Sequence, residues 1–161
     1  VPVVANGKSE QASINGVLSC LRQLKTIIEG NEKLVLDDGW YIIREYMHNL
    51  RSSGQPGVGD AFLKWVLINQ SNPERCDRVR IELVDPNDPN KTHFKNFPDD
   101  PALAHFDPSD RKFVAVALAH PDHPPIANAI DPDWWQYRNV LQMHGITIQF
   151  LCEADIQELC E

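Results

Sequence analysis

The stretch FDPSDRKFVAVALAHPDHPPIANAIDPDWW, residues 106–135, decides the fold because it combines a capped apolar helix, a short strand and a series of aspartates. Asp107 is a typical N-cap residue, Pro108 suits the first helical position, and Asp110 stands at the third, as in a capping box. The residues that follow, to about His120, are apolar on nearly every face. This pattern predicts a helix enclosed in an α/β core rather than one on the surface.

A short apolar run, residues 126–130, follows three prolines and predicts a buried parallel strand. Asp131 and Asp133 come directly after it, at the carboxyl end where open α/β sheets bind their ligands. Pro132 separates the two aspartates, and Trp134 follows them. The same residues would also form a turn into a helix, so both a structural and a functional interpretation of these aspartates are open.

The overall composition restricts what the chain can do. With 161 residues, 42% of them hydrophobic, a single compact domain over residues 1–161 is expected. The net charge of -8 argues against binding of nucleic acid by bulk electrostatics, although it allows a local basic groove or an acidic site masked by metal. No apolar run approaches the roughly 20 residues of a membrane span, and residues 1–10 lack the pattern of a signal peptide, so we expect a cytoplasmic protein.

The four cysteines are scattered without CxxC spacing, which indicates buried or free thiols rather than a zinc site or a disulfide framework.

The remaining elements follow from hydrophobic periodicity and turn signals. Strands are predicted at residues 1–5, 33–36, 78–84 and 146–151, and helices at 13–29, 40–50, 61–69, 134–144 and 153–161. Asp60 is predicted to cap the third of these helices, residues 51–59 to form a surface loop, and residues 85–100 to be irregular. Strands separated by helices of this length favour a largely parallel sheet that is covered on both faces.

The segments LVLDDGWYIIREYMHNL, FDPSDRKFVAVALA, NAIDPDWW and GITIQFL occur in this order. With them the chain resembles, over nearly its whole length, a PIN domain (PilT N-terminus), in particular the branch of toxin-like ribonucleases. Glu45-Tyr46 and Leu50 match the helix pattern of that branch. The resemblance implies an α/β fold, a PIN-like three-layer sandwich with a central, mostly parallel sheet of strand order 3-2-1-4-5 and helices on both faces.

The resemblance also implies a reaction, the hydrolysis of RNA phosphodiesters by a metal-dependent endoribonuclease with Mg²⁺ or Mn²⁺. The matching positions are Glu45, Asp110, Asp131 and Asp133, with Asn6 as a neutral ligand. Mg²⁺ takes only one or two carboxylates directly and keeps several waters, so acids from separate elements have to converge. RNA is the implied substrate, an antitoxin protein is an implied partner, and a homodimer is a further arrangement to test.

Two departures from the family pattern support an alternative. Val4 stands where the family has an aspartate at the end of its first strand, and Ala129 replaces a frequent Thr or Ser. The alternative is a catalytically impaired PIN-like domain that binds RNA or a protein. A third hypothesis is a small-molecule phosphoesterase on the same scaffold. In purely structural terms, Asp110 would stabilise a helix dipole and Glu45 would lie on a solvated helix face.

Overall fold

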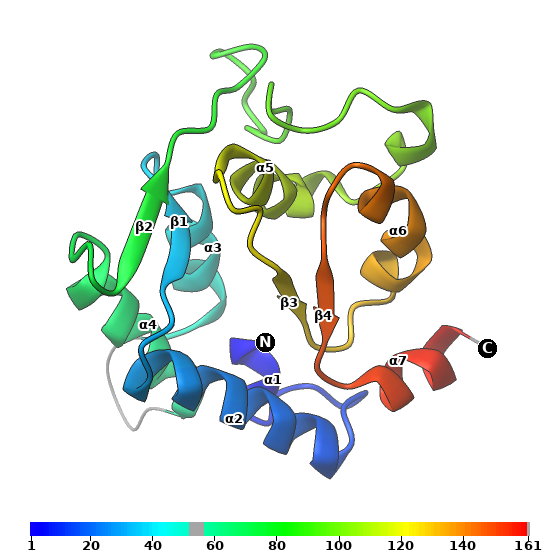
Figure 1. The fold of residues 1–161 in the computed structure, drawn as a ribbon. Coiled ribbons are helices and arrows are strands. Elements are labelled where there is room, and N and C mark those ends of the chain that lie inside the picture. Colours follow the sequence, from blue (N-terminus) through cyan, green and yellow to red (C-terminus); the bar gives the residue numbers. More distant parts are fainter. Residues whose placement is uncertain (52–56, 161) are drawn as a thin grey trace.

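The structure, a computed structural model, describes residues 1–51 and 57–160 (Figure 1). Its helices are α1 (Pro2–Ala5), α2 (Ile14–Glu29), α3 (Tyr41–Asn49), α4 (Val58–Asn69), α5 (Arg111–Ala119), α6 (Pro132–Met143) and α7 (Glu153–Cys160), and its strands are β1 (Leu34–Asp37), β2 (Cys76–Val79), β3 (Ile126–Asn128) and β4 (Ile148–Phe150). Two short 3₁₀ helices, η1 (Pro101–Leu103) and η2 (Pro108–Asp110), precede α5.

The strands form two separate parallel pairs. β1 pairs with β2, with Leu34 opposite Cys76, and β3 pairs with β4, with Ile126 opposite Ile148. The predicted α/β class and the parallel pairing are therefore confirmed. In the described residues, however, the four strands are not joined into one sheet with the order 3-2-1-4-5.

The prediction of a first strand at residues 1–5 was wrong, because Pro2–Ala5 forms the short helix α1. Pro2 occupies a first-turn position, where its fixed φ and missing N–H are tolerated. The N–H groups of Ala5 and Asn6 donate to the carbonyls of Val1 and Pro2. Val4 is buried in the core and lies on a helix, so it does not stand at the end of a strand.

Helix α5 lies in the middle of the molecule and packs on both sides, as its apolar sequence predicted. Ala115 and Val116 belong to one cluster of buried side chains, which also includes residues of α2, β1 and α4. Val114 and Ala117 belong to a second cluster with residues of α6. Figure 1 shows α5 above the space between the two strand pairs.

Two further boundaries differ from the predictions. The strand predicted at residues 78–84 is β2, which begins at Cys76 and ends at Val79. Beyond it, the alternating apolar residues yield only an isolated bridge from Leu83 to Phe94 within the described chain, because the Pro- and Asn-rich segment that follows supplies no partner strand. Helix α4 begins at Val58, so Asp60 lies inside its first turn and accepts the Gly57 N–H at 2.9 Å.

The other predicted elements are found within a few residues of their expected positions, and residues 85–100 contain neither helix nor strand apart from the bridge at Phe94. Of the loop predicted at 51–59, residues 52–56 lie outside the described part of the chain.

All four cysteines are free thiols, and three of them are buried. Among the described helices, none has the length and apolar character that crossing a membrane requires.

Candidate active site

A cavity of about 780 Å³ separates the two strand pairs. We call it the inter-sheet cavity. Leu34 and Val35 of β1 bound it on one side, and Ile126 and Ala127 of β3 bound it on the other. Most of its lining is apolar, so the acidic residues that reach it stand out.

Three of the predicted site residues line this cavity, and they come from separate elements. Glu45 projects from α3, Asp110 ends η2 at the start of α5, and Asp131 precedes α6. All three line one cavity although they are far apart in the sequence. The structure therefore keeps these three acids as the candidate site.

Asp110 is the most perturbed of the three acids. One of its carboxylate oxygens accepts the indole N–H of Trp134 at 3.0 Å. Burial, followed by the nearby charges of Asp131 and Asp107, raises the pKa of Asp110 to about 7, although the Trp134 bond and Lys112 act in the opposite direction. The capping role predicted for this region belongs to Asp107, whose carboxylate accepts the Ser109 N–H at 2.8 Å.

Asp131 faces Asp110 and also begins helix α6. Its Oδ1 accepts the backbone N–H of Asp133 at 3.0 Å, which makes it the N-cap. Burial is the main cause that raises the pKa of Asp131 above its ordinary value. The charge of Asp131 also raises the pKa of Asp110, so the ionisation of one carboxyl group opposes the ionisation of the other.

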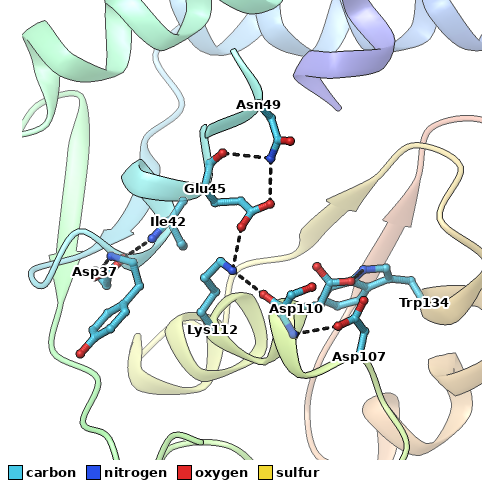
Figure 2. Close-up of polar contacts among 10 residues, drawn as sticks. Asp37, Ile42, Glu45, Asn49, Asp107, Asp110, Lys112 and Trp134 are labelled. Carbon is cyan, nitrogen blue, oxygen red and sulfur yellow. Dashed lines mark hydrogen bonds and ion pairs between the residues drawn. The ribbon is translucent and has the colours of Figure 1, made fainter. Parts of the chain in front are cut away.

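Glu45 is held by a cation and an amide. Its Oε2 lies 3.1 Å from the ammonium of Lys112, and its Oε1 accepts from the side-chain amide of Asn49 at 2.9 Å. The Lys112 ammonium also donates to the carbonyl of Ser109 (Figure 2). Figure 2 shows the Lys112 side chain reaching from the start of α5 to Glu45 on α3, so the charge of this glutamate is paired with an ammonium group.

The remaining two predicted ligands do not line the cavity. Asp133 lies in the first turn of α6, where an acidic side chain favours the helix dipole. Asn6 accepts the N–H of Gly59 through its Oδ1 at 2.7 Å. A side chain on Gly59 would collide with the Pro2 carbonyl and with Asn6, so this asparagine joins α1 to α4 at a close approach.

Sequence reasoning missed the roles of Lys112 and Trp134. Lys112 follows the predicted capping sequence by two residues, and nothing local indicates that it reaches a glutamate on α3. Trp134 reads as a docking residue, and it is indeed buried against Phe106. The clue to its second role is chemical, because a buried indole N–H requires an acceptor.

The donor set suits a hard divalent cation in part. Asp110 and Asp131 supply paired carboxylate oxygens, and Mg²⁺ commonly binds through one or two carboxylates and several waters. Within residues 1–51 and 57–160, no group of three His, Cys, Asp or Glu side chains forms a ready-made metal site. Glu45 is paired with the Lys112 ammonium instead.

Comparisons with protein-family descriptions, with curated proteins and with solved structures gave no match to this chain.

Proposed function

We propose that this chain is a metal-dependent endoribonuclease of PIN type, which hydrolyses RNA phosphodiesters at the edge of the inter-sheet cavity. The observation that carries the proposal is the facing pair Asp110 and Asp131, with raised pKa values, beside Glu45 in one cavity. Two carboxylates forced together in an apolar site are costly unless a proton or a cation lies between them. Such pairs are more frequent at functional sites than elsewhere.

In this proposal Asp110 and Asp131 hold the cation, Mg²⁺ or Mn²⁺. When bound, the ion supplies a Lewis acid that lowers the pKa of water and stabilises the leaving oxygen. Trp134 orients Asp110 through its indole N–H. Cation binding would displace the proton that the pair retains near neutral pH, so metal affinity should increase as the pH rises.

Glu45 and Lys112 form the second part of the site. Lys112 is mostly buried at 12% exposure, whereas the Glu45 side chain is 38% exposed. A phosphate at the edge of the cavity would offer the Lys112 ammonium an alternative anion. Glu45, freed from this ion pair, would be available as a general base.

Cleavage of labelled RNA tests the proposal directly. Purified protein is incubated with RNA and Mn²⁺, and Asp110→Asn is compared with Asp122→Asn, an exposed aspartate outside the cavity. We expect cleavage by the parent chain and by Asp122→Asn, and a loss of at least about 100-fold in Asp110→Asn, since a metal-holding carboxylate is removed. Equal cleavage by all three, or none by any, contradicts the proposal.

One observation favours the alternative of a catalytically impaired module that binds RNA or a protein. The Lys112 ammonium already neutralises the charge of Glu45, and Asp110 can retain a proton near neutral pH. The negative charge of the site can therefore be compensated without a metal cation. Thermal unfolding with increasing Mn²⁺ distinguishes the two functions. A real metal site stabilises the folded protein by mass action, whereas a module without one does not respond.

RNA is the proposed substrate, and an antitoxin protein and a second copy of the chain are the proposed partners. The proposed setting is the cytoplasm. Activity on nucleotides but not on RNA would favour the small-molecule phosphoesterase instead.

A further inference from the structure

β1 has an inner edge that faces the inter-sheet cavity. In the described residues its pairing partner is β2 alone. The N–H of Leu34 donates to the carbonyl of Arg75 at 3.0 Å, on the β2 side. Backbone N–H groups of successive residues point to opposite sides of a strand, so the N–H of Val35 points away from β2. Val35 lines the inter-sheet cavity.

β3 has the same arrangement on the opposite wall. The N–H of Ile126 donates to the carbonyl of Thr147 at 2.9 Å, on the β4 side. The N–H of Ala127 therefore points away from β4, and Ala127 lines the cavity as well. Figure 1 shows β1 and β3 as the inner strands of the two pairs, so within the described residues two open strand edges face the inter-sheet cavity from its two sides.

The open strand edges indicate which kind of ligand would occupy the apolar cavity. Buried N–H and C=O groups are costly when they have no partner, and an open strand edge is a template for a further strand. Asn128, on β3, also lines the cavity, and its buried Oδ1 has no hydrogen-bond partner in the described structure. A compact small molecule could occupy the volume, but only an extended backbone offers donors and acceptors to both edges.

We propose that the inter-sheet cavity is the seat of a central β-strand, supplied by a polypeptide segment joined to the amino group of Val1. Val1 and Pro2 line the cavity, and burial lowers the pKa of the Val1 ammonium. A residue attached to this nitrogen starts inside the cavity and needs no connecting loop. β-branched residues in that segment would join the two strand pairs into one sheet, which is a role beyond the proposed nuclease function.

Two extended chains test this proposal. One carries Lys-Val-Thr-Val-Val directly before Val1, and the other carries Lys-Val-Pro-Val-Pro, which has the same length but lacks two N–H donors. A five-residue strand reaches roughly 16 Å at about 3.3 Å per residue, enough to run beside the four residues of β1. The readout is amide hydrogen exchange at Val35 and Ala127, with thermal unfolding as a second measurement.

We expect the valine-rich extension to slow exchange at both amides by roughly tenfold or more and to raise the unfolding temperature, because both N–H groups gain an acceptor. The proline-containing extension should change neither. Equal exchange in the two extended chains overturns the proposal.

Equal protection of the unextended chain by the free valine-rich peptide, added in excess, overturns the claim that the strand must be joined to Val1. Protection that depends on protein concentration overturns it too, because the strand would then enter a second copy. Exchange and unfolding do not require cleavage, so a failure here is distinguishable from a failure of the nuclease proposal.

Discussion

Asp37 and Asp131 occupy equivalent places in the two halves of the molecule, yet their surroundings differ. Asp37 ends β1, and its carboxylate accepts N–H groups at the start of α3, whereas Asp131 follows β3 and is the N-cap of α6. Both oxygens of Asp37 are used by the backbone, one by the N–H of Tyr41 at 2.8 Å and the other by that of Ile42 at 2.9 Å. Asp131 uses one oxygen to cap α6 and faces Asp110.

This difference separates a structural carboxylate from a functional candidate. Asp37 is buried at 1% exposure and both of its oxygens accept N–H groups of α3, so it is not accessible to a ligand. Asp131 keeps acceptor capacity toward the inter-sheet cavity, where a second carboxyl group makes its ionised form costly. Placement after a strand is therefore not sufficient for a site, and unused acceptor capacity is the better criterion.

The largest loss of folding stability is expected for Asp37→Ala. The substitution leaves two N–H groups at the start of α3 without partners in a buried place, and the cost should be about 3 kcal/mol of the free energy of unfolding. Denaturant unfolding measures it. Asp38→Ala, at the exposed neighbouring position, is the matched control and should change the stability by less than about 0.5 kcal/mol. Equal costs for the two variants would refute the structural role of Asp37.

The second effect is a pH dependence that comes from Asp110. Its pKa is raised to about 7 in the folded protein, so between pH 4 and 7 the folded state binds more protons than the unfolded state. Its contribution to stability is therefore largest at the acidic end, falls as the pH rises through this window, and is constant above it. After a discount for partial exposure of the side chain, we expect a fall of about 2 kcal/mol.

Unfolding of the parent chain and of Asp110→Asn, measured in EDTA at a series of pH values, checks this expectation. The difference in stability between the two should vary with pH over this window. A constant difference would show that Asp110 titrates normally.

A smaller effect is expected for Asp131→Ala. The variant loses one capping hydrogen bond, which costs about 1 kcal/mol, but it also removes the repulsion of Asp110. The net loss in denaturant unfolding should therefore stay below about 1 kcal/mol, well under that of Asp37→Ala. The pKa of Asp110, followed by NMR, should decrease in the same variant. If Asp131→Ala were as destabilising as Asp37→Ala, the two carboxylates would have the same role.

The contrast between these aspartates also shows what the sequence can predict. The periodicity of residues 13–29, the capping sequence at Asp107 and the apolar helix after it depend on neighbours in the chain, and they were predicted correctly. The helix at Pro2–Ala5 was not. Short apolar runs fit a strand or a helix equally well, and contacts of α1 with α2 and α4 decide between them.

The candidate site was predictable as a set of acids but not as a geometry. The resemblance to PIN domains named Asp110 and Asp131, whereas their positions at a helix start and after a strand were equally compatible with capping roles. The Lys112 ion pair joins residues of different helices, and no local pattern shows it. Asn6 was assigned to the site because its segment was expected to be a strand. Because that segment is a helix, the Asn6 side chain accepts a hydrogen bond from the Gly59 N–H instead.

The smallest effect is expected for Trp134→Phe, which tests whether the indole N–H holds Asp110 in its ionised form. That N–H donates to the carboxylate at 3.0 Å, and a hydrogen bond to the charged form lowers a pKa. Its removal should raise the pKa of Asp110 further and weaken Mn²⁺ binding. Trp135→Phe is the matched control, since Trp135 packs on Phe150 and Arg138. NMR titration of the Asp110 carboxyl carbon measures the shift, and the same pKa in both variants would remove Trp134 from the site.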